Sequence, residues 1–185
     1  MTETSEHQQE SPSSKGGAGF LEFIVILLVA FSFVFGIIRP FVLEAFYIPS
    51  PSMVPTLEVG DHVFINKFIY RFHEPKQGDI VVFKSVEGDD EDLIKRVMGV
   101  GGDEIELRNG GLYVNSQLLE EPYLNEKYPD YSSFGPVTVP EGTVFVMGDN
   151  RGDSEDSRYF GPLPLKNIEG KAFVIYWPVG HIRLL

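Results

Sequence analysis

Residues 20–38 read FLEFIVILLVAFSFVFGII and decide how this chain of 185 residues is organised. Glu22 is the only charge in the stretch, and as an α-helix these residues would span roughly 28 Å, close to the ~30 Å hydrocarbon core of a bilayer. A cleaved secretory signal usually has a shorter apolar region and a small-x-small site after it, whereas Arg39 and Pro40 follow here. A buried core helix without a polar face exceeds what a small domain can hide. We therefore interpret Phe20–Ile38 as a transmembrane anchor.

The residues before the anchor form a polar tail, MTETSEHQQESPSSKGGAG at 1–19. Nothing in this tail can bury enough surface to offset the entropy of ordering, so we predict that it is disordered. The tail has three glutamates and one lysine, and Arg39 flanks the other side of the anchor. With one basic residue on each side, the positive-inside rule does not favour either orientation. The charges therefore leave the topology open.

Composition excludes several classes of protein. The chain has 27 acidic and 15 basic side chains and a formal net charge of −12, which argues against binding to nucleic-acid phosphates. It has no cysteine, which excludes disulfides, Cys–zinc sites and a thiol nucleophile. The acidic run at 87–92 indicates a solvated loop rather than a metal site, and we predict no metal and no cofactor.

Residues 39–185 have the texture of a β-rich domain. Short β-prone runs alternate with turn dipeptides such as Asn109-Gly110, and no segment sustains a 3.6-residue apolar stripe over three turns. The predicted strands are 62–66, 79–84, 93–100, 104–108, 112–115, 137–139, 143–148 and 171–177. The predicted fold class is mainly β with one N-terminal transmembrane α-helix.

Histidine gives little sign of a catalytic or metal site. The four histidines are His7, His62, His73 and His181. None has the H-x-x-x-H spacing of a helical zinc site, and His7 lies in the tail. A Ser-His-Asp triad can assemble from distant segments, so spacing alone leaves it open. We interpret most of the histidines as surface or structural residues.

Three other segments can support chemistry, and each has a plainer interpretation beside it. Ile48–Leu57, IPSPSMVPTL, has three prolines that stiffen an irregular segment and present two serines; it is either a linker or a turn that carries a nucleophilic serine. Lys95 lies within a β-prone apolar run. It is either a strand lysine that reaches solvent or a buried amine whose lowered pKa makes it a general base. Met147–Gly161 is either a polar loop held by ion pairs or a loop that orients that lysine.

In this order, the segments resemble the bacterial type I signal peptidases, membrane-bound serine proteases with a Ser–Lys dyad. The matching motifs are PSPSMVPTL (49–57), GDHVFINK (60–67), GDIVVFK (78–84), KRVMGVGGD (95–103) and GDNRGDSEDSRYFG (148–161). Any one of them is weak, but five in the family's order beside an anchor are specific. The resemblance covers residues 20 to about 177.

The resemblance implies roles for individual residues. Ser52 would be the nucleophile and Lys95 its general base. The Ser50 hydroxyl would join the Ser52 N–H in the oxyanion hole, and Ser154 would hydrogen-bond the lysine. Structural support would come from two neighbouring motifs, containing Asp149, Arg151, Asp156 and Arg158. The residues expected to line shallow pockets for small substrate side chains at −1 and −3 are Phe46, Ile48, Pro49, Met53, Leu57 and Ile94.

The resemblance also implies a topology and partners. The tail at 1–19 would be cytoplasmic, and the catalytic domain at 39–185 would lie on the outer or periplasmic face of the bacterial cytoplasmic membrane. Its partners would be signal peptides of secreted preproteins and the phospholipid bilayer, and it would act alone or near the export translocon. Gly101 and Gly152-Asp153 depart from the family's usual residues in ways that touch no proposed catalytic atom. The stretch 109–136 is short, so we expect only a small hairpin-like elaboration there.

Two other functions use the same features. A self-cleaving Ser–Lys regulator would share the catalytic chemistry, but such proteins carry a DNA-binding module in place of an anchor. A catalytically inactive, membrane-anchored β domain that binds exported peptides would need the pockets without the dyad. Cleavage of a test preprotein separates both from a signal peptidase.

Overall fold

The computed structural model describes residues 16–38, 42–88, 90–124 and 129–185. Residues 1–15 of the predicted tail lie outside this range, as do Arg39 and Pro40. The chain divides after Pro40 into two compact units.

The first unit is an apolar helix. α1 (Gly16–Phe33) continues through a π-helical turn, η1 (Val34–Ile38). Within it, Gly19–Gly36 has the length and the apolar composition that a membrane crossing needs, and none of this stretch is buried by protein. Exposed apolar side chains such as Phe20 and Ile26 cover its surface, which favours lipid over water as their surroundings. The predicted apolar helix is confirmed, but it begins at Gly16, so residues 16–19 of the predicted disordered tail are helical.

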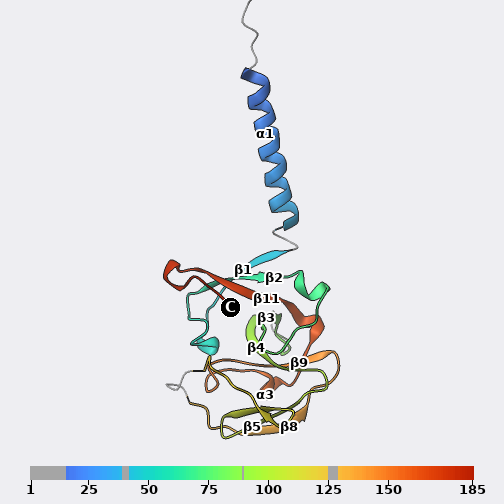
Figure 1. The fold of residues 1–185 in the computed structure, drawn as a ribbon, viewed down its shortest axis with the longest axis vertical. Coiled ribbons are helices and arrows are strands. Elements are labelled where there is room, and N and C mark those ends of the chain that lie inside the picture. Colours follow the sequence, from blue (N-terminus) through green and yellow to red (C-terminus); the bar gives the residue numbers. More distant parts are fainter. Residues whose placement is uncertain (1–15, 39–41, 89, 125–128) are drawn as a thin grey trace, which may run out of the picture. The chain divides into compact units, whose positions relative to one another are not determined.

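The second unit is built on a large antiparallel sheet (Figure 1). Its strands run in the spatial order β1-β2-β11-β3-β4-β9-β10, and β12 pairs with β11. The bounds are β1 (Leu43–Tyr47), β2 (His62–Asn66), β3 (Ile80–Lys84), β4 (Asp92–Val100), β9 (Thr143–Met147), β10 (Leu163–Pro164), β11 (Ile168–Trp177) and β12 (Arg183–Leu184).

A smaller sheet packs against β4 and β9 of the large one. Its order is β7-β6-β5-β8, with bounds β5 (Glu104–Arg108), β6 (Gly111–Val114), β7 (Gln117–Leu118) and β8 (Phe134–Thr138). Ile105 and Leu107 of β5 share a buried cluster with Met98 of β4 and Phe145 of β9. The elaboration expected around 109–136 is therefore more than a hairpin: it begins at β5 and forms a four-stranded sheet whose buried cluster is shared with β4 and β9.

Helices in the second unit are short. They are η2 (Pro51–Met53), η3 (Ile69–Arg71), α3 (Ser157–Phe160), η4 (Leu165–Asn167) and η5 (Val179–His181). Each is about one turn long, which agrees with the lack of a helical apolar stripe after residue 40. The mainly β fold class is confirmed.

Candidate active site

Ser52 lies in the short turn η2, which residues 48–50 separate from the end of β1. Pro51 occupies the first position of this turn, where its fixed φ suits a helical start. Met53, the last residue of the turn, is fully buried in the hydrophobic core and anchors the turn there. Ser52 is 7% exposed. The proline-stiffened segment thus holds the serine on a rigid turn at the edge of the core.

Lys95 reaches this serine from β4. The lysine is only 3% exposed, and its Nζ donates a hydrogen bond of 2.9 Å to Ser52 Oγ. Burial lowers the pKa of Lys95 to about 8, and the nearby carboxylates of Asp156, Glu155 and Asp149 oppose that shift. No ion pair to Lys95 is present among the described residues. The structure therefore places together a hydroxyl and an amine that can be neutral near physiological pH.

Ser50 and Ser154, the other two predicted serines, differ in position. Ser50 is exposed, and its Oγ lies 3.3 Å from Ser52 Oγ. The Ser154 Oγ is buried and has no hydrogen-bond partner among the described residues, so the hydrogen bond expected between Ser154 and Lys95 is not formed. The Ser154 side chain instead packs against Gly148, where its Oγ would be 2.3 Å from an added Cβ.

The loop from Gly148 to Arg158 holds the serine turn in place. The Asn150 N–H donates to the Ser52 carbonyl at 3.0 Å, and Asn150 Nδ2 donates to the Pro51 carbonyl at 3.2 Å. Gly148 is close enough to this turn that an added Cβ would lie 2.5 Å from the Ser52 carbonyl oxygen. The loop and the turn are therefore packed backbone against backbone.

Asp156 closes the loop. Its Oδ2 accepts from the Gly148 N–H at 3.0 Å, and its Oδ1 accepts from Arg158 Nε at 2.8 Å. The Asp156–Arg158 pair that the resemblance implied is thus present, with Asp156 fully buried. Asp156 also caps α3 by accepting from the Arg158 N–H.

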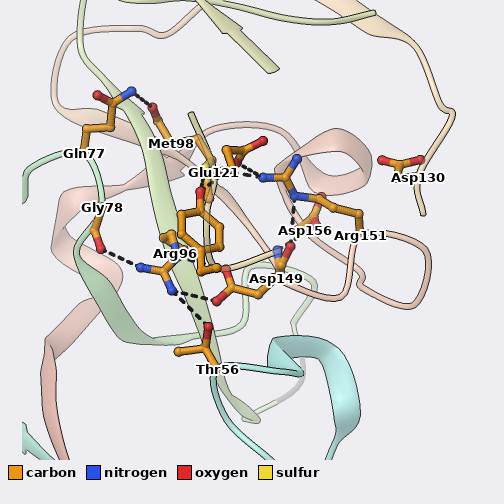
Figure 2. Close-up of polar contacts among 12 residues, drawn as sticks. Thr56, Gln77, Gly78, Arg96, Met98, Glu121, Asp130, Asp149, Arg151 and Asp156 are labelled. Atoms are coloured by element: carbon orange, nitrogen blue, oxygen red, sulfur yellow. Dashed lines mark hydrogen bonds and ion pairs between the residues drawn. The ribbon is translucent and has the colours of Figure 1, made fainter. Parts of the chain in front are cut away.

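Asp149 and Arg151 each bind a partner outside the loop (Figure 2). Asp149 pairs with Arg96, which donates from Nε at 2.9 Å and from Nη2 at 2.7 Å. Arg151 pairs with Glu121. Arg96 follows the predicted lysine in the sequence, and Asn150 lies within the quoted motif at 148–161, although no role was assigned to it. No pattern pointed to Glu121, whose partner Arg151 is distant in the chain.

Two small cavities adjoin the dyad. One of about 220 Å³ is lined by Ser50, Ser52 and Lys95, with carboxylates on its rim. The other, of about 120 Å³, also includes Ser50 and Lys95. Its apolar lining contains four of the predicted substrate-binding residues, Phe46, Ile48, Pro49 and Ile94.

The other two predicted pocket residues line neither cavity. Met53 and Leu57 are both 0% exposed and belong to the core between β2, β3 and β11. Ile48 and Ile94 belong to the same buried cluster and still line the smaller cavity, so the role of Met53 and Leu57 in a substrate pocket stays a prediction.

The described histidines do not approach Ser52. His181 Nδ1 lies 2.8 Å from Asp61 Oδ1, and His62 packs against Tyr47 and Tyr176. Neither cavity beside Ser52 has a histidine in its lining. The base that contacts Ser52 in this structure is a lysine.

Comparison with known proteins gives a consistent family. The family model described as "Signal peptidase, peptidase S26" matches residues 20–177. A probable signal peptidase I-2 of Synechocystis sp. is 39% identical over all of this chain and 84% of its own length. The signal peptidase I of Leptolyngbya laminosa is 44% identical over 78% of this chain and 74% of its own.

A solved structure is also similar: that of a signal peptidase I from Enterococcus faecalis, with 36% sequence identity and a TM-score of 0.47, covering 54% of this chain and 97% of that one. The family model spans most of the chain, and the curated relatives match it over most of their own length. This chain therefore belongs to the signal peptidase family, peptidase S26.

Proposed function

We propose that this chain is a membrane-anchored serine endopeptidase that removes signal peptides from exported preproteins. Ser52 is the nucleophile and Lys95 is the general base. The observation that carries the proposal is the 2.9 Å contact between Lys95 Nζ and Ser52 Oγ, made by a lysine that is 3% exposed. Family membership supports the reaction class, and the apolar helix supports anchoring in a membrane.

The dyad supplies the chemistry of acyl transfer. When Lys95 is neutral, its amine accepts the Ser52 proton while Ser52 Oγ attacks the carbonyl carbon of the scissile bond. The Ser50 hydroxyl and the Ser52 N–H stabilise the oxyanion that forms; removing one such donor typically costs ~10²–10³ in rate. The protonated Lys95 then gives its proton to the leaving amine, and water hydrolyses the acyl-enzyme with Lys95 again as base.

The edge of β4 offers a place for the substrate backbone. Residues Asp92–Lys95 pair with β3 on one side, whereas β9 pairs with β4 only from Arg96 onward. The other edge of Asp92–Lys95 is therefore available to an extended peptide, which would add as a further strand. The 120 Å³ cavity beside this edge has room for small side chains only, which fits cleavage after small residues at −1 and −3.

The proposal includes the topology that the family implies. The chain would cross the bacterial cytoplasmic membrane once, with its N-terminus in the cytoplasm and its β domain on the outer or periplasmic face. It would contact the bilayer and act on preproteins alone or beside the export translocon.

Cleavage of a test preprotein by the full chain, purified in detergent, tests the proposal. We expect one cut after a small residue, identified by N-terminal sequencing of the product, and no cut by Ser52→Ala or Lys95→Ala. A β-lactam-type acylating inhibitor should label Ser52 in the wild type alone.

The rival functions give different results in the same assay. An inactive peptide-binding domain would bind the preprotein and leave it whole, and a self-cleaving regulator would cut only its own chain. Full activity in a folded Ser52→Ala or Lys95→Ala variant would refute the dyad.

A further inference from the structure

One segment beside the smaller sheet contacts the residues around the dyad without lining either of the dyad's cavities. We call residues Leu119–Leu124, LEEPYL, the arm. The arm follows β7 and is tied to the smaller sheet by the Leu119 N–H, which donates to the Leu112 carbonyl at 2.8 Å. Leu119 and Tyr123 also pack on the buried cluster of that sheet. The arm is therefore a fixed part of the elaboration.

Glu121 of the arm neutralises a buried arginine. The side chain of Arg151 is 1% exposed and that of Glu121 is 6% exposed, and the two form an ion pair. Tyr123 holds the carboxylate from the other side, since its hydroxyl donates to Glu121 Oε1 at 2.7 Å. Without Glu121, the buried Arg151 charge would have no ion-pair partner among the described residues, which is strongly unfavourable.

Tyr123 covers a second arginine. The Cζ atom of Arg96 lies 3.9 Å from the centroid of the Tyr123 ring, a distance typical of a cation–π contact. The same guanidinium binds Asp149 through two nitrogens and the Gly78 carbonyl at 3.1 Å. Tyr123 therefore packs on the guanidinium that pairs with Asp149.

The two arginine contacts of the arm act on Asp149 and Arg151, the residues before and after Asn150 in the sequence. Asp149 is held by Arg96 beneath Tyr123, and Arg151 is held by Glu121. Asn150 between them donates its N–H to the Ser52 carbonyl and its Nδ2 to the Pro51 carbonyl. The arm therefore fixes both sides of the residue that holds the nucleophile's backbone.

We propose that Glu121 and Tyr123 are positioning residues for Ser52, acting through Arg151, the Arg96–Asp149 pair and Asn150. The proposal rests on the proposed function of Ser52 and Lys95. Neither arm residue touches the dyad, so the arm sets the separation of Ser52 Oγ and Lys95 Nζ without taking part in proton transfer. Misplacement of a reacting group by about 1 Å can cost on the order of 10²-fold in rate.

The test compares two adjacent glutamates. Glu121→Gln removes the charge that pairs with Arg151, whereas Glu120→Gln removes the same charge from an exposed neighbour. For each variant, kcat and KM for a test preprotein are measured in detergent, at least 20 °C below the variant's measured Tm. We expect Glu121→Gln to lower kcat by about 10-fold or more, with KM within about twofold, because the β4 edge and its cavity do not change.

Two further readouts separate positioning from simple structural support. The rate at which an acylating inhibitor labels Ser52 should fall in parallel with kcat in Glu121→Gln. Glu121→Asp keeps the carboxylate and should recover part of that rate. A loss of stability alone would change the fraction of folded protein and leave the rate per folded site unchanged.

The outcomes decide between the alternatives. If folded Glu121→Gln cleaves and acylates like Glu120→Gln, the proposal is overturned. If Glu121→Gln does not fold, Tyr123→Phe decides, since it deletes only the hydroxyl that holds Glu121; we expect a severalfold fall in kcat at constant KM, and a wild-type kcat would overturn the proposal. Failure of the wild type to cleave would instead reject the proposed function.

Discussion

The two faces of strand β4 bury two neighbouring cations in opposite ways. Lys95 is 3% exposed and contacts a neutral hydroxyl, Ser52 Oγ, at 2.9 Å. Arg96 is 9% exposed and is matched by the Asp149 carboxylate through two nitrogens. Because consecutive strand residues point to opposite faces, the two side chains enter separate environments although they are adjacent in sequence.

The difference shows how burial is used on each face. On the Lys95 face, desolvation lowers the lysine pKa to about 8 and makes the amine available as a base. On the Arg96 face, the paired carboxylate keeps the guanidinium charged and turns it into a link between β4 and the loop that holds Ser52. The unpaired Lys95 is thus suited to the proposed proton transfer, whereas the paired Arg96 connects two segments.

The largest effect on activity is expected when both faces of β4 carry an arginine. Lys95→Arg places a permanent cation beside Ser52, because a guanidinium does not deprotonate in proteins. We expect preprotein cleavage to fall by a factor on the order of 10³ or more, in a protein that still folds by circular dichroism. Cleavage within tenfold of the wild type would mean that Lys95 is not the base.

Removing the pairing charge on the other face should act through stability. Asp149→Asn leaves the Arg96 guanidinium buried without its carboxylate, and breaking a buried pair in this way costs about 3–5 kcal/mol. Urea unfolding of the β domain measures this loss. Asp153→Asn, at an exposed position of the same loop, is the matched control and should change the free energy of unfolding by less than about 0.5 kcal/mol.

Substitution of Gly148 can disrupt the contact between the Gly148–Arg158 loop and the turn that carries Ser52. A Cβ at Gly148 would lie 2.5 Å from the Ser52 carbonyl oxygen, whereas a Cβ at Gly152 meets nothing within 4 Å. Gly148→Ala should therefore displace Ser52 and lower kcat by about 10²-fold, and Gly152→Ala should cleave like the wild type. Equal kcat values for the two alanine variants would show that the loop does not set the position of Ser52.

The pH dependence of the reaction reports the Lys95 face alone. Only the neutral amine accepts the Ser52 proton, so activity is absent where Lys95 is charged and appears as pH rises through its pKa of about 8. Below that pKa, kcat/KM should rise about tenfold per pH unit, and above it the profile should level off. A profile that is flat between pH 6 and pH 9 would contradict a depressed lysine pKa.

The smallest effect on stability is expected at the exposed ion pair between β3 and β4. Lys84 Nζ lies 2.6 Å from Asp92 Oδ1, with side chains 46% and 33% exposed. Solvent screens such a pair, so Asp92→Asn should change the free energy of unfolding by less than about 1 kcal/mol. A loss as large as that of Asp149→Asn would show that exposure does not separate the two pairs.

Most of the large sheet was predictable, because its strands carry their signal locally. HVFIN at 62–66 alternates in burial, with Val63 and Ile65 fully buried, as its pattern predicts. β1 was missed because LEAFY has no clear alternation and pairs with only one neighbour, β2. The two-residue strands β7, β10 and β12 are too short to leave a pattern.

The candidate site was predictable to the extent that it resides in contiguous motifs. Ser52 and Lys95 lie in such motifs, and their contact is present in the structure. Met53 and Leu57 are 0% exposed, and the local sequence does not distinguish an apolar residue that faces the substrate from one that faces the core. Glu121 and Tyr123 were missed because their partners lie about 30 residues away in the chain.

The sequence by itself determined the apolar helix, the strand pattern and the order of the serine and lysine motifs, because periodicity and composition act over short stretches of chain. Only the tertiary structure decided which face of β4 would leave its cation unpaired, and which segment would clamp Asn150. Those properties depend on burial and on carboxylates from distant segments. Burial lowers the pKa of Lys95 so that its amine can act as a base, and the buried pair with Asp149 lets Arg96 connect β4 to the loop that holds Ser52.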